Sequence, residues 1–504
     1  MLRRFHLSHI ICFGLSLLII GVYFFAWFKL SLNIPIGDDF PAYVELTSKF
    51  SANQLKVSDF FLQINEHRIL YDRLWWIINL GLTNFVNFKF LLFIGNLSLV
   101  FLLMFFYKII ADLKLSIWLL PAAALVIFSW VGYSNSLCSM MALQNYTFPL
   151  LVCWGIYFLA NGSSNNQYFL GNIALLLAFY TSGIGFIAMA FGVTILFFRK
   201  LYKPALISLL VSAVFIGIYF KFYQSSPVQS DILAGISNPV ELSIRYFAFL
   251  GGILNISHLS PIPEVILGLM LFGAFLFSLQ KLKNKLPLDL LVITLFFLFL
   301  AGIVVTARFE LNEYIANRFK INSAIIFICI AILFWQALAE NKIRKFFIAG
   351  LLFITAALNL FNYKAFNDYK YWVDEFAVDL LNVKYGVETT AYQPKGKEYI
   401  RKAFYNPNFQ KAFNGLNEQE ILKYSIPVEV LSSPDGGLEL RIKPLQRSKV
   451  NRPVLCCKNQ YDQIIGYFPL HGSKLNGEAW KFNDVSGIIA SKKNYTYLVA
   501  DLKP

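Results

Sequence analysis

The sequence predicts an all-α polytopic membrane protein that carries a soluble, β-rich domain at its C-terminal end. Of its 504 residues, 57% are hydrophobic and only 14% are charged, whereas soluble domains carry about 25% charged residues. Many apolar runs approach the ~20 residues that a helix needs to cross a bilayer. The net charge of +15 resides mostly in short loops between these runs, where basic residues set membrane topology.

The first apolar run, residues 10–30, is predicted to span the membrane and to stay uncleaved. It follows Arg3 and Arg4, it is long for the apolar core of a signal peptide, and no small-residue cleavage site comes after it. Its N-terminal end is therefore expected in the cytoplasm, and the loop over residues 31–88 is expected on the outer side.

Further apolar runs bring the prediction to about 11 transmembrane helices within residues 1–361. Two of these helices share residues 168–198 and are separated by a tight turn at Thr181–Gly183. With this arrangement, every strongly basic short loop falls on the cytoplasmic side. The other predicted spans are residues 90–110, 116–131, 148–160, 205–222, 265–279, 290–305, 321–338 and 346–361.

Three stretches between the spans have a mixed character. Residues 69–86 are predicted to form a helix in the outer interface, with Trp75 and Trp76 at the level of the lipid headgroups. Residues 132–146, rich in Ser and Asn, are expected to face outside. Residues 223–261 are either an outer loop with a re-entrant segment or a pair of half-length helices.

Residues 362–504 contain no predicted span and are expected to form a soluble domain on the outer side. Pro434–Gly437 is a turn signal between two short runs of strand character. We therefore predict a helical lead-in followed by a β-rich domain. The runs of strand character are residues 428–431, 438–442, 463–468, 487–490 and 495–500.

The outer loop over residues 31–88 begins with an acidic pair, Asp38 and Asp39, directly after a Pro-Ile-Gly turn. One of two adjacent carboxylates tends to have a raised pKa, which suits a general base. Charge kept beside the lipid-embedded part of a membrane protein usually has a function. The pair is therefore a candidate catalytic group.

The same loop continues with a second charged group, Glu66, His67 and Arg68, and Arg73 follows. On the functional interpretation, these four side chains bind the substrate. The plainer interpretation is a solvated loop before an amphipathic surface helix, in which Arg68 and Asp72 form an ordinary i,i+4 ion pair.

Three basic residues, Arg308, Arg318 and Lys320, flank the outer mouth of a later pair of spans. A planar guanidinium binds a phosphate group through two parallel hydrogen bonds, which suits a lipid phosphate at the interface. Pairing of the two arginines with Glu310 and Glu313 is an alternative of equal weight.

Several sequence motifs are absent. The sequence has no P-loop, no HExxH, no GxSxG and no His or Cys cluster with metal-ligand spacing. Its six cysteines have no regular spacing. These absences give no support to ATP hydrolysis or a tight structural metal site. No cofactor is expected, and dependence on a divalent metal stays open.

The order of these motifs, and the side of the membrane on which they fall, resemble the C-type (GT-C) membrane glycosyltransferases. The resemblance is closest to the bacterial serotype-converting glucosyltransferases that decorate O-antigen, and it covers residues 1 to about 360. It is carried by Gly37–Asp39, Asn65–Arg68, the break at Ser182–Gly183, Thr306–Arg308 and Ala316–Phe319.

The resemblance implies a hexosyltransferase of the bacterial inner membrane. Its donor would be a sugar, often glucose, on undecaprenyl phosphate or a similar polyprenyl phosphate, and its acceptor a periplasmic lipopolysaccharide chain. Asp38 or Asp39 would deprotonate the acceptor hydroxyl, with inversion at the anomeric carbon. Arg308 and Arg318 would bind the phosphate, while Glu66, His67 and Arg68 would orient the acceptor or bind the donor. No nucleic acid partner is implied.

Three other functions compete with this one. A transporter or flippase of lipid-linked sugars would use the break at Ser182–Gly183, although transporters typically show internal repeats and a midplane site. A polymerase, ligase or acyltransferase of envelope polysaccharide would share the topology and the substrates. A non-enzymatic assembly scaffold would not need the acidic and basic groups.

Overall fold

The computed structural model describes residues 7–224, 235–254, 260–309 and 315–384, together with seven short strands between residues 426 and 501. The chain divides into two compact units. The first unit comprises residues 1–27, 56–75 and 91–366, and the second comprises residues 28–55, 76–90 and 367–504. Each unit is described by itself.

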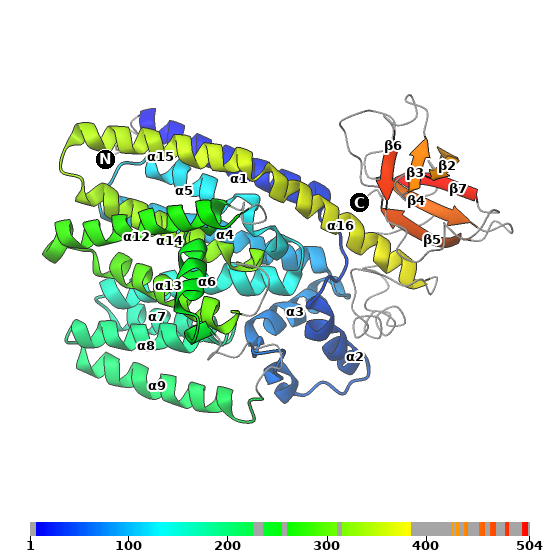
Figure 1. Cartoon of the computed structure of the whole chain (residues 1–504). Helices are drawn as coiled ribbons and strands as arrows, with labels where there is room; N and C mark the ends of the chain where they lie inside the picture. Colours follow the sequence, from blue (N-terminus) through cyan, green and yellow to red (C-terminus); the bar gives the residue numbers. More distant parts are fainter. Residues whose placement is uncertain are drawn as a thin grey trace. The chain divides into compact units, whose positions relative to one another are not determined.

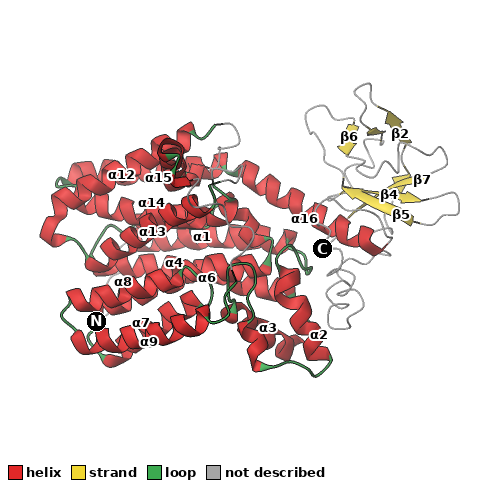
Figure 2. Ribbon diagram, turned by 60° about the horizontal axis from the view of Figure 1, so that its bottom comes forward, coloured by secondary structure: helices red, strands yellow, loops and turns green. Residues whose placement is uncertain are grey.

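A helix occupies each of the predicted membrane spans. In the first unit these helices lie side by side (Figures 1 and 2), and α6 to α9 pack each on the next, as do α13 and α14. The helices are α1 (Leu7–Leu30), α4 (Phe88–Asp112), α5 (Leu119–Ile127), α6 (Ser139–Asn161), α7 (Asn165–Phe179), α8 (Gly185–Phe198), α9 (Tyr202–Phe220), α12 (Ile262–Leu282), α13 (Leu288–Ala307), α14 (Lys320–Ala337) and α15 (Asn341–Phe361).

Seven helices within the described residues are long and apolar enough to cross a membrane, so the chain is a helical membrane protein. They are α1, α4, α9, α12, α13, α14 with η6 (Asn317–Phe319), and α15 with α16 (Tyr363–Lys384). An eighth candidate is α5 with η3 (Trp130–Ser136), two helices that meet at a bend of 49°. The turn at Thr181–Gly183 leaves α7 and α8 with 15 and 14 residues. The count of about 11 spans stays a prediction.

The polar stretch over residues 132–146, which is predicted to face outside, is helical over most of its length, and its side of the membrane stays a prediction. Its first residues belong to η3, and α6 begins at Ser139. The hydroxyl of Ser136 is buried and bonds with the hydroxyls of Tyr23, at 2.8 Å, and Tyr146, at 3.0 Å. The polar side chains satisfy one another inside the helix bundle. They therefore need no contact with water.

The predicted interfacial helix exists as α3 (Leu70–Thr83), but Trp76 does not lie at a lipid interface. Its ring is fully buried, and its indole N–H donates to Thr47 Oγ1 at 3.1 Å. Because the polar end of the ring is satisfied within the protein, it has no need of headgroup water.

The stretch over residues 223–261 contains one half-length helix within its described part, α11 (Pro239–Leu250), followed by the short turn η4 (Gly252–Leu254). The helix packs closely on α12. A Cβ at Gly251 would lie 2.0 Å from the carbonyl oxygen of Glu264, and a Cβ at Gly268 would lie 1.9 Å from that of Phe247. Glycine at both positions is what allows the two backbones to approach.

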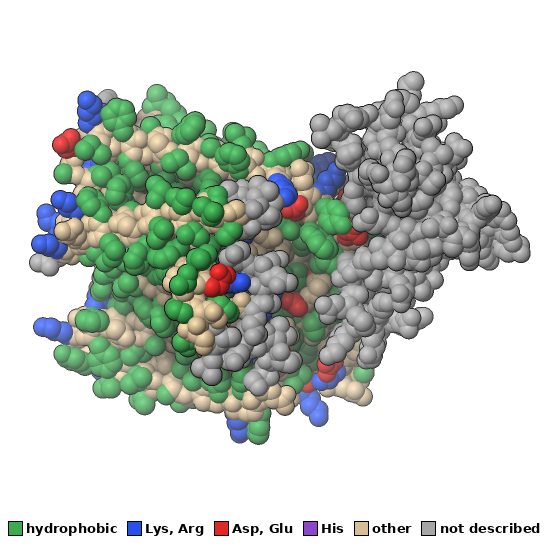
Figure 3. Space-filling view, viewed as in Figure 1, with side chains coloured by type: hydrophobic (Ala, Val, Ile, Leu, Met, Phe, Trp, Pro, Cys, Tyr) green, Lys and Arg blue, Asp and Glu red, His purple; other side chains and the backbone are tan. Residues whose placement is uncertain are grey.

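Exposed basic residues lie in the loops at one end of the first unit. Lys200 stands between α8 and α9, Lys203 at the start of α9, Lys283 and Lys285 between α12 and α13, and Lys342 at the start of α15. In Figure 3 Lys and Arg side chains gather along the left-hand edge, and hydrophobic side chains cover most of the helical face beside it. Both α9 and α13 start at this end, so both finish at the opposite end (Figure 1).

In the second unit, the first loop forms η1 (Phe40–Val44) and α2 (Glu45–Ser51). The described strands after residue 425 form two antiparallel sheets, in the orders β1-β7-β4-β5 and β2-β3-β6. The strands are β1 (Ile426–Pro427), β2 (Glu429–Ser432), β3 (Leu438–Arg441), β4 (Pro453–Lys458), β5 (Ile464–Pro469), β6 (Ala479–Phe482) and β7 (Thr496–Asp501).

The side chain of Asn382 joins helix α16 to strand β5. The amide of Asn382 donates to the carbonyl of Tyr467 on β5, and the Tyr467 N–H donates back to it, both at 2.7 Å. The predicted run over residues 487–490 and the turn at Pro434–Gly437 lie outside the described residues. A β-rich domain as a whole stays a prediction.

Candidate functional site

The candidate site is built on a two-residue turn in the first unit. The N–H of Ile64 donates to the carbonyl of His67 at 2.8 Å, and the N–H of His67 donates back at 2.9 Å. Asn65 adopts a left-handed backbone conformation, with φ of 49°, which Asn tolerates better than most residues. The turn places the side chains of Glu66 and His67 next to each other at its tip.

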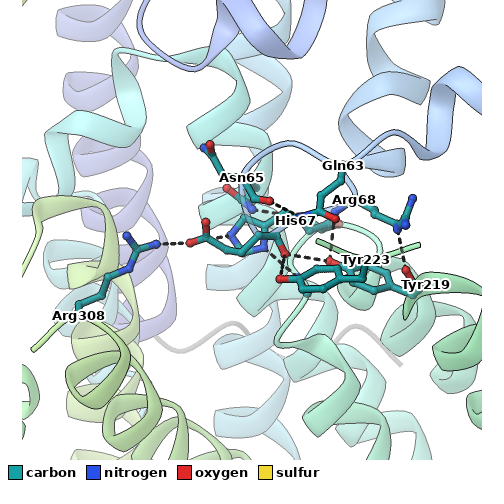
Figure 4. Close-up of polar contacts among 11 residues, drawn as sticks. Gln63, Asn65, His67, Arg68, Tyr219, Tyr223 and Arg308 are labelled. Carbon is teal, nitrogen blue, oxygen red and sulfur yellow. Dashed lines mark hydrogen bonds and ion pairs between the residues drawn. The ribbon is translucent and has the colours of Figure 1, made fainter. Parts of the chain in front are cut away.

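The base of this turn is fastened to the C-terminal end of α9 (Figure 4). Arg68 donates from Nε to the carbonyl of Tyr219 at 2.7 Å and from Nη2 to that of Lys221 at 2.8 Å, and Nη1 bonds the carbonyl of Phe61. Through these bonds the guanidinium of Arg68 holds neighbouring backbone segments in place. Within the described residues, Arg68 does not form the i,i+4 ion pair with Asp72 that the plainer interpretation expected.

Arg73 and Gln63 also hold the backbone in this region. Nη1 of Arg73, a predicted substrate-binding residue, donates to the carbonyls of Phe60, at 3.0 Å, and Leu62, at 2.5 Å. The side-chain amide of Gln63 donates to the carbonyl of Gln224 at 2.6 Å and accepts from its N–H at 3.1 Å. These contacts fix the segment that leads into the turn.

The short turn between α7 and α8 contacts the same tip. Gly183 N–H donates to Nδ1 of His67 at 3.2 Å. A Cβ at Gly183 would lie 2.6 Å from the hydroxyl of Tyr219 and 3.2 Å from the carbonyl oxygen of Glu66. That carbonyl accepts hydrogen bonds from the hydroxyls of Tyr219, at 3.3 Å, and Tyr223, at 3.4 Å. The position therefore requires glycine.

Arg308, the first residue after α13, forms an ion pair with Glu66. The bond joins Nη2 of Arg308 to Oε1 of Glu66, and Figure 4 shows Arg308 pointing toward the turn. Each of the two side chains is 17% exposed. Glu310 and Glu313, the partners that the alternative interpretation gave to the arginines, lie outside the described residues.

His67 completes the cluster and is neutral at pH 7. Its Nε2 lies 3.7 Å from Oε1 of Glu66. Burial lowers the pKa of His67 to about 4; Glu66 opposes this shift, and the positive charges of Arg318 and Arg308 add to it. Because Nδ1 accepts from Gly183, the proton is assigned to Nε2, which faces Glu66.

Arg318 lies on η6, close enough to the cluster for its charge to act on His67. Its backbone carbonyl accepts a hydrogen bond from the side chain of Asn135 at 2.9 Å, and Asn135 in turn accepts from Asn145 at 2.9 Å. Lys320, the first residue of α14, is buried. Thus the structure brings Glu66, His67 and Arg308 into contact, and the positive charge of Arg318 acts on His67.

The acidic pair belongs to the second unit. Asp39 is fully buried, and its Oδ2 accepts from the backbone N–H of Ile36 at 3.0 Å. Gly37, with φ of 57°, forms the turn between these residues. Asp38 is half-buried and so more accessible than Asp39. The catalytic role of either residue stays a prediction.

Two arginines, one carboxylate and a neutral imidazole leave this cluster with a net positive charge, so it is suited to binding an anion. Within the described part of the chain, no group of three or more His, Cys, Asp and Glu side chains is placed to hold a metal ion. No protein-family model, curated protein or solved structure matches the chain. The chemistry of the cluster itself is therefore the guide to function.

The sequence indicated Glu66, His67, Arg308 and Arg318 but missed Tyr219, Tyr223 and Gln63. These three residues hold the turn in place. Tyr219 lies within an apolar run, and aromatic residues are common in membrane-spanning helices, so the sequence does not mark it as functional. The approach of α9 to the turn that carries Glu66 reveals its role.

Proposed function

We propose that this protein is an inverting membrane glycosyltransferase of the bacterial inner membrane. It moves a sugar, with glucose as the expected one, from a polyprenyl phosphate to a periplasmic polysaccharide such as O-antigen. The observation that carries the proposal is the cluster of Glu66, His67, Arg308 and Arg318 at the ends of apolar helices. A cationic cluster at that position suits the phosphate headgroup of a lipid.

The position of the cluster supports an outer-face reaction. Both α9 and α13 begin beside basic loops and end beside the cluster. By the positive-inside rule the basic end faces the cytoplasm, which puts the cluster on the periplasmic face. Nucleotide-activated sugars are not supplied on that face, so a lipid-linked donor fits the location.

In the proposed reaction, an acceptor hydroxyl displaces the lipid phosphate from the anomeric carbon of the sugar. An aspartate of the first loop, Asp38 or Asp39, takes the proton of an acceptor hydroxyl. The hydroxyl oxygen attacks the anomeric carbon, and the bond from that carbon to the phosphate oxygen breaks with its electron pair. The leaving group changes from a phosphodiester with one negative charge to a phosphomonoester with two. Arg308 and Arg318 stabilise the charge that develops there.

The remaining parts have supporting roles in the proposal. Lys320 adds positive charge near the phosphate site, and Arg68 and Arg73 hold the loop that carries Glu66 and His67. The chain after residue 361 holds the polysaccharide acceptor. No organic cofactor is part of the proposal, and dependence on a divalent metal stays open.

The test is sugar transfer by the purified full-length protein. It is incubated with polyprenyl-phosphate-linked, labelled glucose and an O-antigen polysaccharide, and the anomeric configuration of the product is read by NMR. The proposal expects labelled polysaccharide with the configuration inverted. If the protein instead carries the donor across proteoliposomes without modifying any polysaccharide, the transporter alternative is correct and the proposal is wrong.

A further inference from the structure

The carboxylate of Glu66 occupies the place in the cluster that suits an anionic ligand. Nη2 of Arg308, from a distant segment, bonds Oε1 of Glu66, and Nε2 of the neighbouring His67 lies 3.7 Å from the same oxygen. The guanidinium of Arg318 acts on the same region. Carboxylate and phosphate oxygens accept hydrogen bonds from the same donors in the same geometry. This single oxygen therefore marks a position that a phosphate oxygen would suit.

We propose that Glu66 is a built-in competitor for the phosphate site: its carboxylate binds Arg308 in the resting protein and is displaced when the lipid phosphate binds. This inference rests on the proposed function, because it takes a polyprenyl phosphate as the ligand. It goes beyond that function by giving the resting site an occupant from the chain itself. It also assigns Glu66 a role in the binding and release of the phosphate.

The side chain of Glu66 is able to leave while the turn stays in place. The bonds from Tyr219 and Tyr223 are made to its backbone carbonyl, and the pairing of Ile64 with His67 uses backbone groups alone. None of these contacts involves the carboxylate. Rotation about the side-chain bonds of Glu66 therefore exchanges one anion for another at Arg308.

A built-in competitor has a use in this reaction. Two guanidinium groups beside a partly buried histidine repel each other, and Glu66 offsets one positive charge when the site holds no ligand. After sugar transfer, the polyprenyl monophosphate carries one more negative charge than the donor did, so it binds more tightly. Return of Glu66 to Arg308 speeds the release of this product.

The experiment measures binding of farnesyl phosphate, a short polyprenyl monophosphate, to the purified full-length protein. Glu66→Gln keeps the size of the side chain and removes its charge. We expect it to tighten binding roughly tenfold, because the competing charge for Arg308 is gone. The matched control is Glu241→Gln, which removes a carboxylate from the i,i+4 ion pair with Arg245. This control should leave binding unchanged.

Two further arms make the outcome decisive. Glu66→Asp keeps the charge but shortens the side chain, so it should tighten binding of farnesyl phosphate by a smaller factor. This variant replaces Glu66→Gln in the test if the Gln variant fails to fold. Adding Arg308→Ala to Glu66→Gln should abolish the gain. Unchanged or weaker binding in both Glu66 variants overturns the proposal, as does an equal gain in the Glu241 control.

A comparison of probes distinguishes a lipid phosphate from free phosphate as the ligand of the site. Inorganic phosphate and farnesol are measured beside farnesyl phosphate, and we expect weak binding of both. Equal binding of inorganic phosphate would show a site for free phosphate and overturn the lipid assignment. Because the assay needs no sugar transfer, its result is independent of catalysis. Tighter binding in Glu66→Gln without any sugar transfer by the wild-type protein would reject the glycosyltransferase function and support the competition of Glu66 with the phosphate.

Discussion

At the scale of single residues, charged groups around the candidate site show two kinds of contact. Arg68 and Arg73 donate to backbone carbonyls, so they hold the chain in place. Glu66 and Arg308 instead engage each other through side-chain atoms. Another anion is able to replace Glu66 at Arg308 without moving the backbone. Loss of the bonds from Arg68 or Arg73 would instead release the backbone that they hold.

The acidic pair gives the first prediction. Asp38→Asn and Asp39→Asn keep the side-chain shape, and in the Asp39→Asn variant the amide oxygen is still able to accept from Ile36. Loss of a general base typically lowers the rate by roughly 10²–10⁴-fold, so one of the two variants should lose transfer activity to that extent. Asp112→Asn, at the end of α4, is the control. If both variants insert normally and both keep near-full activity, the loop does not supply the base.

His67 gives a prediction about pH. Its pKa is lowered from 6.5 to about 4 in the folded protein, so between these values the unfolded chain binds more protons than the folded one. Its effect on stability is therefore constant above about pH 6.5, and stability falls as the pH drops toward 4. In detergent, the Tm advantage of wild type over His67→Gln should shrink across this range. An advantage that does not change with pH would contradict the shifted pKa.

At the scale of elements, short breaks between helices position the candidate site. The turn between α7 and α8 contacts His67, Arg308 follows the last residue of α13, and η6 carries Arg318. Asn135 on η3 holds the backbone of η6 through the carbonyl of Arg318. The long helices provide rigid supports, and their ends present the functional side chains.

Gly183 gives the prediction at this scale. Replacing it by Ala places a Cβ 2.6 Å from the hydroxyl of Tyr219, so the turn has to move away from α9. Overpacking of this kind typically costs about 1–3 kcal/mol. We expect a lower Tm in detergent and reduced transfer activity. Gly217→Ala on α9, where no atom lies within 4 Å of the added Cβ, is the matched control and should not lower the Tm. A normal Tm and full activity in Gly183→Ala would contradict the tight contact.

The helices could be predicted from sequence because hydrophobicity is a local property. Each apolar run that was predicted to span the membrane forms a helix. The contacts of the polar stretch over residues 132–146 could not be predicted, because Ser136 finds its partners on α1 and α6. The pair of Glu66 and Arg308 joins residues 242 positions apart. No periodicity in the sequence indicates such a contact, so the charged residues could be selected but not paired.

At the scale of the whole molecule, charge is distributed unequally between the two ends of the first unit. One end carries exposed lysines in short loops, and the other carries the cluster of Glu66, His67, Arg308 and Arg318. The positive-inside rule converts this asymmetry into an orientation. The proposed function depends on that orientation, because the lipid-linked donor is used on the outer face.

Reporter fusions test the orientation. Fusions at Lys283 and at Lys395, which lies beyond the described residues, should report the cytoplasmic and the periplasmic side respectively. The fusions are made in the full-length chain so that all helices are present. The same side for both would reject the topology, and with it the assignment of the cluster to the periplasm.

The most direct measurement of the central claim is donor use by arginine variants. Arg308→Ala and Arg318→Ala remove the proposed phosphate contacts, and Lys342→Ala removes an exposed positive charge at the basic end of the helices. Transfer rates are measured against the concentration of polyprenyl-phosphate-linked glucose. The account predicts that kcat/KM for the donor falls in both arginine variants by the equivalent of about 2–5 kcal/mol and stays normal in Lys342→Ala. Wild-type donor kinetics in both arginine variants would contradict it.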